Sequence, residues 1–320
     1  MTALKAGSVA RRNPTVVVAL VTVAGLAFAI ASACQIVAGY ESFQPPMPHP
    51  CDLLRRTSKI DDAGVKLVLS KVTSPKSTCY WIDEAEVTFD QYNRFADSVA
   101  DGGTVEWDPR CGWKDAGPSD PRKEANPCMM NMESEALRST KPARCIDWCD
   151  AKAFCHWAGK QLCKGDTSGG FLSTTDAIDQ WGKACSANGL QPYVYGPVAE
   201  AGACNVDFDH YGTCYGNLGQ PVCAATDVKS FQSCVSPSGA FDMIGNVAEW
   251  VDLCGSSADA GDPDTLCIHR GGSFASTLQE ATCQQHLGAG DSDSRKTRDR
   301  GLGLRCCAEL NSDEANLVNP

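Results

Sequence analysis

The pattern of apolar and polar positions predicts a few short elements in the first half of the chain. The apolar run at 79–82 predicts a strand. Thr88 and Gln91 have the spacing of a helix capping box, and apolar residues follow them at helical spacing as far as Val99. We therefore expect a strand and then an amphipathic helix that ends before Gly102.

Two further helices are predicted later in the chain. One should begin after Asp147, a good N-cap residue, and stop at Gly159. Another should begin at Ser173 and continue through Ala184, because its apolar residues share one face. Between 196 and 239 only short runs occur, interrupted by glycine, proline and cysteine, so we expect a loop-rich region.

The composition indicates a disulfide-stabilised globular protein. The chain has 320 residues, of which 43% are hydrophobic, enough for one substantial core. Its 19 cysteines indicate an oxidising compartment. None are spaced as CxxC, which argues against zinc ribbons, iron–sulfur clusters and thioredoxin-like redox pairs.

The N-terminal segment has the pattern of a secretory signal. Basic residues at positions 5, 11 and 12 precede an apolar run at 16–30, and three small residues then precede Cys34. We expect Cys34 to carry a lipid, which leaves 18 cysteines that can all form pairs. The alternatives are an ordinary signal cleaved nearby and a retained signal anchor.

These features predict five segments along the chain. They are a signal peptide at 1–33, a lipidated cysteine with a proline-rich spacer at 34–50, an N-terminal extension at 51–78, the main domain at 79–308 and a tail at 309–320.

The charge of the chain argues against a nucleic-acid partner. The formal charge is −11, and it becomes −14 when the three basic residues of 1–33 are removed. Binding to nucleic acid requires lysine and arginine to replace condensed counterions. The one basic cluster, at 295–300, alternates with aspartates and is predicted to be a solvated loop.

Four phrases of the sequence resemble the formylglycine-generating enzyme family, also called the sulfatase-modifying factor family. They lie at 147–162, 241–250, 270–274 and 301–306, and the resemblance as a whole covers about 79–307. It implies an α+β fold, an elaborated C-type-lectin-like domain with little regular secondary structure. The small residues before Cys34 resemble a bacterial lipobox, so we expect a bacterial, cysteine-rich lipoprotein.

The residues that give this family its chemistry differ here. In the family, a CxxxxC pair after the Arg-Gly-Gly-Ser-aromatic phrase binds copper(I) and oxidises a substrate cysteine within Cys-x-Pro-x-Arg. The two positions correspond to Ser276 and Ala281, and Cys283 lies two residues further on without a first cysteine. Copper(I) requires soft sulfur ligands. We therefore expect no copper and no catalytic residues of the family type.

The resemblance also implies calcium sites. The family's Gly-Asn-x-x-Glu-Trp turn can bind calcium, which here implicates Asn246, Val247 and Glu249. The alternative is that Asn246 caps a turn while Glu249 pairs with an arginine such as Arg270. A second, weaker calcium site would involve Asn205 and Val206.

Other notable residues are predicted to be structural. The tryptophans at 148, 157, 181 and 250 should lie in the core, and His156 should be a helix residue with a hydrogen-bonded ring. His210, beside two aspartates, is more typical of a solvated loop than of a metal site. The adjacent Cys306 and Cys307 should form separate long-range disulfides, and Arg305 should pair with a buried carboxylate.

We therefore expect an exported, lipid-anchored envelope protein with a domain that lacks the oxidase site. It would bind a peptide or glycan ligand or act as a rigid module, and it would meet the membrane through its lipid. The alternative is an active enzyme of the superfamily that oxidises the cysteine of sulfatase-type proteins to formylglycine.

Overall fold

A computed structural model describes most of the chain from residue 49 onward. The described residues are 49–54, 58–60, 66–72, 78–114, 117–123, 128, 140–165, 179–186, 191–206, 224–257, 259, 261–284 and 292–318. The predicted signal peptide, lipidated cysteine and most of the spacer lie outside them, as does His210.

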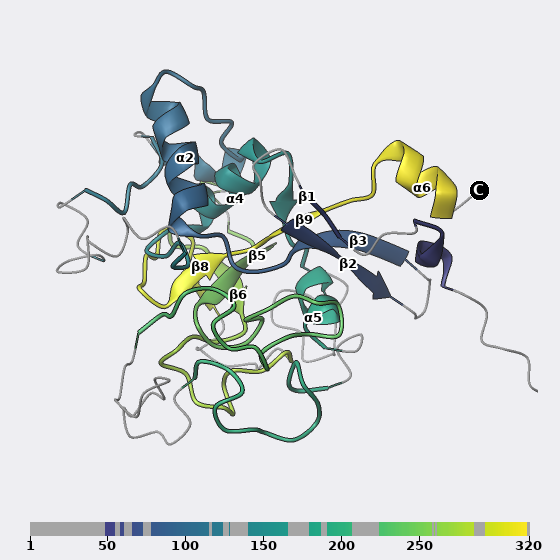
Figure 1. Cartoon of the computed structure of the whole chain (residues 1–320). Coiled ribbons are helices and arrows are strands. Elements are labelled where there is room, and N and C mark those ends of the chain that lie inside the picture. The colour runs from purple at the N-terminus through teal and green to yellow at the C-terminus, as the bar shows by residue number, and fades with distance from the viewer. Residues whose placement is uncertain are drawn as a thin grey trace, which may run out of the picture. The chain divides into compact units, whose positions relative to one another are not determined.

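The regular elements are short and mix helix with strand (Figure 1). The strands are β1 Ser58–Ile60, β2 Lys66–Val72, β3 Thr78–Asp83, β4 Gln161–Leu162, β5 Ala248–Cys254, β6 Leu266–Arg270, β7 Ser292–Ser294, β8 Leu302–Leu304 and β9 Cys306–Ala308. The helices are α2 Phe89–Ala100, α4 Trp148–Trp157, α5 Gln180–Cys185 and α6 Ser312–Val318, with 3-10 turns η1 Pro50–Leu54 and η2 Pro109–Cys111.

Two small sheets organise these elements. One has the strand order β1-β2-β3-β9-β4, and its paired strands are antiparallel. The other has the order β7-β6-β5-β8, in which β5 and β8 are parallel. Because β8 ends at Leu304 and β9 starts at Cys306, the chain passes from one sheet to the other at Arg305.

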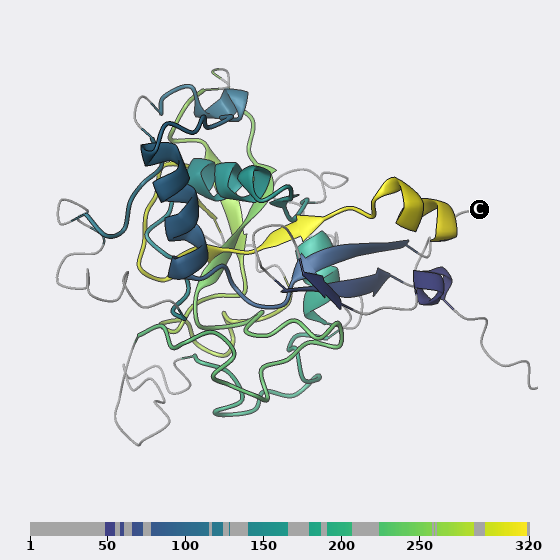
Figure 2. The ribbon, with the colours of Figure 1, turned by 45° about the horizontal axis from the view of Figure 1, so that its top comes forward.

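Helices α2 and α4 lie together beside β5 and β8, whereas α6 lies against η1 beyond the other sheet (Figure 2). An aromatic cluster joins the first two helices, in which Tyr92 and Phe95 contact Phe154 at ring-centroid distances of 5.9 Å. Such pairs contribute about 0.5 to 1.5 kcal/mol beyond their buried area. Aromatic packing therefore fixes α2 against α4.

The predicted helix starts are confirmed where local chemistry sets them. Thr88 and Gln91 make both hydrogen bonds of a capping box at the start of α2. Asp147 caps α4 through its side chain, and Gly159, with φ of +69°, follows its last turn.

The third helix begins later than predicted. The N-cap of α5 is Asp179, whose carboxylate accepts from the backbone N–H of Gly182 at 2.6 Å. The predicted start at Ser173 lies outside the described residues. The prediction of one continuous helix was wrong at Asp179, because its backbone is extended and its side chain caps α5.

Disulfides connect the elements. All sixteen cysteines among the described residues are paired, in the bonds 51–79, 111–149, 128–145, 155–306, 163–307, 185–283, 204–234 and 254–267. Cys306 and Cys307 form separate long-range bonds, as predicted. This framework indicates an oxidising, exported environment.

The described helices and the basic run at 295–300 were also compared with what the sequence predicts. Among the described residues, no helix combines the length and hydropathy needed to cross a membrane.

The basic run at 295–300 is not uniformly solvated, because Arg295 is buried and donates to the carbonyl of Arg110 at 2.7 Å. The prediction of a solvated loop was wrong at this residue, because the aspartates around the run hid a side chain that turns inward.

Candidate functional site

The two positions that correspond to the family's thiols lie close together. A Cβ atom placed on Gly272 would be 3.0 Å from both Ser276 Cβ and Ala281 Cα. Gly272 has φ of +64°, a conformation that favours glycine, so the backbone turns there, before both positions. The Ser276 hydroxyl accepts from the backbone N–H of Ser273 at 3.0 Å, and Ala281 is fully buried. The side chains at the two predicted thiol positions are a hydroxyl and a methyl.

Cys283 cannot replace the missing thiols in this structure. It is disulfide-bonded to Cys185 on α5. A cysteine within a disulfide offers no thiolate, which is the form that binds metals. Within the described part of the chain, no group of three or more histidine, cysteine, aspartate or glutamate side chains could hold a metal ion.

Glu249 of β5 forms a buried ion pair with Arg305, the residue between the two sheets. The Arg305 Nε donates to both carboxylate oxygens at 3.0 and 2.9 Å, and Nη2 donates to Oε1 at 2.8 Å. The indole N–H of Trp181 donates to Oε2 at 2.6 Å. Both side chains of the ion pair are at most 1% exposed. The predicted carboxylate pairing of Arg305 is confirmed, and Glu249 pairs with Arg305 rather than with Arg270.

Further carboxylates surround this ion pair. Burial raises the pKa of Glu86 well above its usual range, and the nearby charges of Asp242 and Glu249 raise it further. Burial also raises the pKa of Asp242 to about 6, although a hydrogen bond from the backbone of Lys229 and the charge of Arg305 oppose the rise. No local pattern in the sequence indicates this cluster, because its members come from distant segments.

Asn205 and Asn246 meet, which the sequence did not reveal. The side chain of Asn205 donates to Asn246 Oδ1 at 3.0 Å, and the backbone N–H of Asn246 donates to the carbonyl of Asn205 at 2.8 Å. The Asn246 amide donates to Glu86 at 3.1 Å, and Glu86 accepts from the backbone N–H of Val247 at 3.2 Å. Val206 and Val247 are buried beside them.

These contacts bear on the predicted calcium sites. Calcium takes about six to eight oxygen ligands. Both oxygens of Glu249 already accept hydrogen bonds, and its neighbour Arg305 is a cation, so Glu249 does not fit as a calcium ligand. Among the described residues, Oδ1 of Asn205 is a buried oxygen without a hydrogen-bond partner. The calcium sites predicted at Asn246 and Val247 and at Asn205 and Val206 stay predictions.

The tryptophans follow the core prediction with one exception. Trp148, Trp181 and Trp250 are fully buried. Trp157, in the last turn of α4, is 39% exposed, so its prediction as a core residue was wrong. Trp157 lies at the end of the helix, next to His156. The ring of His156 forms a hydrogen bond with Glu106 at 3.1 Å.

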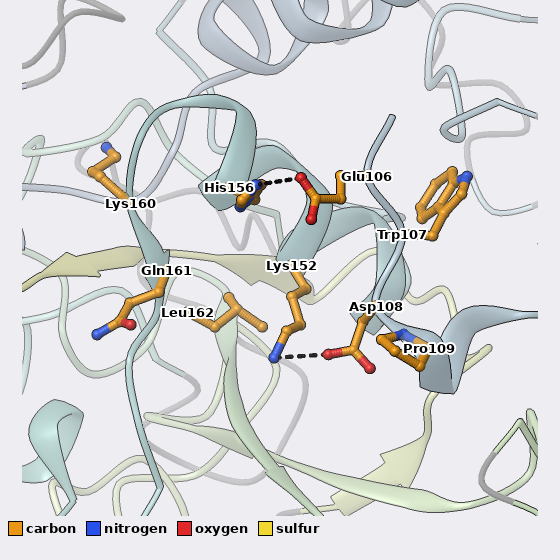
Figure 3. Close-up of a pocket in the computed structure, with 9 residues that line it drawn as sticks. All are labelled: Glu106, Trp107, Asp108, Pro109, Lys152, His156, Lys160, Gln161 and Leu162. Atoms are coloured by element: carbon orange, nitrogen blue, oxygen red, sulfur yellow. Dashed lines mark hydrogen bonds and ion pairs between the residues drawn. The ribbon is translucent and has the colours of Figure 1, made fainter. Parts of the chain in front are cut away.

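A cleft lies next to this exposed end of α4 (Figure 3). Its volume is about 220 Å³. It is lined by Glu106, Trp107, Asp108, Pro109, Lys152, His156, Lys160, Gln161 and Leu162. Figure 3 shows two ion pairs across it, Glu106 with His156 and Asp108 with Lys152. The sequence predicted α4 but not the segment 104–109 that faces it.

Comparison with known proteins identifies the class. Residues 69–310 match the sulfatase-modifying factor enzyme 1-like domain, and the chain therefore belongs to this family. The expected α+β, C-type-lectin-like fold with little regular secondary structure is confirmed. No curated protein matches the chain.

Several solved structures are similar in fold. CarF is 15% identical, with 78% of this chain and 100% of that chain covered and a TM-score of 0.45. Treponema denticola variable protein 1 is 16% identical, covering 80% and 100%, with a TM-score of 0.44. PvdO from Pseudomonas aeruginosa is 16% identical, covering 79% and 98%, with a TM-score of 0.47. At these levels the similarity carries no statement about activity.

The first prediction concerns the buried ion pair. Glu249→Gln keeps the shape of the side chain but leaves the charge of Arg305 buried without its carboxylate, so we expect a loss of about 3 to 5 kcal/mol in the free energy of unfolding. The loss should be equal in calcium and in chelator, because the carboxylate binds Arg305 and Trp181 rather than a metal. Denaturant titration under non-reducing conditions measures it.

A matched control uses an exposed ion pair. Glu309 bonds to Lys164, and both side chains are more than half exposed. Glu309→Gln should cost no more than about 1 kcal/mol. A loss in Glu249→Gln that occurs only when calcium is present would contradict the assignment of Glu249 to Arg305.

The second prediction concerns pH. Because the pKa of Asp242 is about 6 in the folded protein and about 3.9 in an unfolded chain, the folded state binds more protons between these values. The resulting stability is fully present below pH ~4 and is lost as the pH rises through ~6, at up to about 1.4 kcal/mol per pH unit. Glu86 acts in the same direction.

Asp242→Asn should make the fall in the free energy of unfolding with rising pH shallower. Asp242 has φ of +54°, a conformation that asparagine also adopts, so the variant should fold. The free energy of unfolding from pH ~4 to ~7 is the measurement. Asp264→Asn, at an exposed aspartate, serves as the control and should leave the slope unchanged. An unchanged slope in Asp242→Asn would show that another group carries the effect.

Proposed function

We propose that this protein is an exported, ligand-binding member of its family that does not perform the copper-dependent oxidation. The observation that carries the proposal is the pair Ser276 and Ala281 at the family's thiol positions. Neither a hydroxyl nor a methyl replaces a soft thiolate as a ligand for copper(I).

The disulfide framework supports the same conclusion. A copper-thiolate site needs two reduced cysteines side by side, and every cysteine among the described residues is oxidised. The same bonds hold loops in place, and each contributes about 2 to 4 kcal/mol to stability. A rigid, loop-rich domain suits binding of a peptide or glycan, since little ordering is needed when the ligand arrives.

We also propose that the protein is anchored in the cell envelope by a lipid. Cys34 would carry a lipid, and the proline-rich segment that follows would hold the domain away from the membrane surface in the cell envelope. The oxidised cysteines support export, and the apolar run before Cys34 supports a signal peptide.

The third prediction tests the chemistry. The purified protein, supplied with copper(I) and oxygen, should not convert the cysteine of a Cys-x-Pro-x-Arg peptide to formylglycine, because it lacks paired thiolates. Mass spectrometry of the peptide reports the conversion. An active formylglycine-generating enzyme serves as the positive control and copper(I) alone as the blank. Turnover above the blank would establish the alternative, an active enzyme of the superfamily.

The fourth prediction tests the anchor. Cys34→Ser should move the protein from the membrane fraction to the soluble fraction, because two acyl chains anchor a protein stably and each buried methylene contributes about 0.8 kcal/mol. Immunoblotting of fractionated cells measures the shift, with Ser42→Ala as the control. If Cys34→Ser stays in the membrane fraction, a retained signal helix is the correct account.

A further inference from the structure

Two hollows of similar size lie side by side between α4 and the segment 104–109. The first is the cleft of Figure 3, with a volume of about 220 Å³. The second has a volume of about 190 Å³ and is lined by Phe95, Thr104, Val105, Glu106, Ala153, His156 and Trp157. Both include Glu106 and His156, so the ion pair between these residues forms the boundary between the two hollows.

The helix presents a different face to each hollow. Lys152 and His156 are one turn apart on α4 and line the first hollow. Ala153 and Trp157 are also one turn apart and line the second. Lys152 gives the first hollow a charged group on its helix side, Trp157 gives the second hollow an aromatic ring, and His156 lines both.

The charges at the first hollow neutralise one another. Lys152 pairs with Asp108 at 3.1 Å and with Asp252 at 2.7 Å, and Arg110 pairs with the same two carboxylates at 2.8 and 3.1 Å. Burial opposes ionisation of Asp108, but hydrogen bonds from Arg110 and Lys152 hold its pKa well below its usual range. The cluster thus contains two cations and two anions.

The remaining charges of the first hollow are also paired. Lys160 bonds to Asp83 at 2.7 Å, and His156 bonds to Glu106. A ligand with a full charge would have to displace one member of these pairs to find an opposite charge. A neutral ligand can instead use the third N–H of Lys152, which has two carboxylate partners, and the free acceptor sites of the exposed Glu106.

The hollows also provide apolar surface. Pro109 and Trp107 contribute it in the first hollow, and Trp157 and Val105 contribute it in the second. The ligand should therefore combine neutral hydrogen-bonding groups at its edge with an apolar face. A sugar ring has this combination, with hydroxyl groups at its rim and C–H bonds on its faces.

The size of the site favours a ligand of more than one unit. Pockets for drug-sized ligands have volumes of about 300 to 1,000 Å³, so each hollow alone is smaller than such a pocket. Two adjacent hollows fit two linked rings. A peptide fits less well, because the nearby edge strand β4 has two residues and offers little backbone for strand addition.

We propose that the two hollows beside α4 bind two adjacent rings of a neutral oligosaccharide, with Trp157 beneath one ring and Lys152 and Glu106 at the hydroxyl groups of the other. This inference rests on the proposed function and names the ligand class and the site.

The fifth prediction is a binding experiment with the purified protein. Its probes are immobilised neutral oligosaccharides of increasing length, anionic oligosaccharides and a peptide library. We expect binding to neutral oligosaccharides, with two-ring probes stronger than single rings. Trp157→Ala, which removes the apolar surface, and Thr104→Trp, which fills the second hollow from an exposed position, should each weaken binding at least tenfold.

The controls separate this inference from the proposed function. Leu266 is exposed outside the two hollows, and Leu266→Ala should bind as the wild type does. Thermal melting checks that each variant folds, and Thr104→Trp remains informative if Trp157→Ala is unstable. Sugar binding that neither variant weakens, or binding only to peptides or anionic sugars, would overturn the cleft proposal while leaving a ligand-binding protein. Absence of neutral oligosaccharide binding would also overturn the cleft proposal, whereas formylglycine production would overturn the proposed function.

Discussion

The buried ion pair between Arg305 and Glu249 fixes the point at which the chain crosses between its two sheets. Arg305 follows β8 in one sheet and precedes β9 in the other, and its guanidinium also donates to the carbonyls of Asp83 and Phe241 at 2.8 and 2.6 Å. Asp83 in turn accepts from the backbone N–H of Cys306 at 2.9 Å. One side chain thus connects β5, the end of β3 and the crossing strand, and the disulfides of Cys306 and Cys307 hold that crossing in place.

This arrangement gives the family phrases a role in the fold. Glu249 belongs to the phrase at 241–250 and Arg305 to the phrase at 301–306, and the two residues meet in the core. Arg270, from the phrase at 270–274, donates to the carbonyl of Cys283 at 3.1 Å. These residues serve the fold, because a buried charge without its counter-charge is strongly destabilising. Ser276 and Ala281 lie in the same scaffold but make no comparable ionic contact among the described residues, so the chemistry there can change while the fold remains.

Local signals in the sequence predicted local structure well. The caps at Thr88 and Asp147 depend on residues within one helical turn, and both are present. The start of α5, the burial of Arg295 and the exposure of Trp157 depend on which distant segment packs against each residue. For the same reason the sequence did not show which cysteines pair, that Asn205 meets Asn246, or that a cleft forms beside α4.

We propose that this chain has the family fold but lacks the family's two metal-binding thiols. The most direct test is a titration of the folded, unreduced protein with copper(I) in competition with a chromogenic chelator. We expect the chelator to retain the copper, because Ser276 and Ala281 offer no thiolate and Cys283 is bonded to Cys185. One equivalent of copper(I) held tightly by each chain would contradict it.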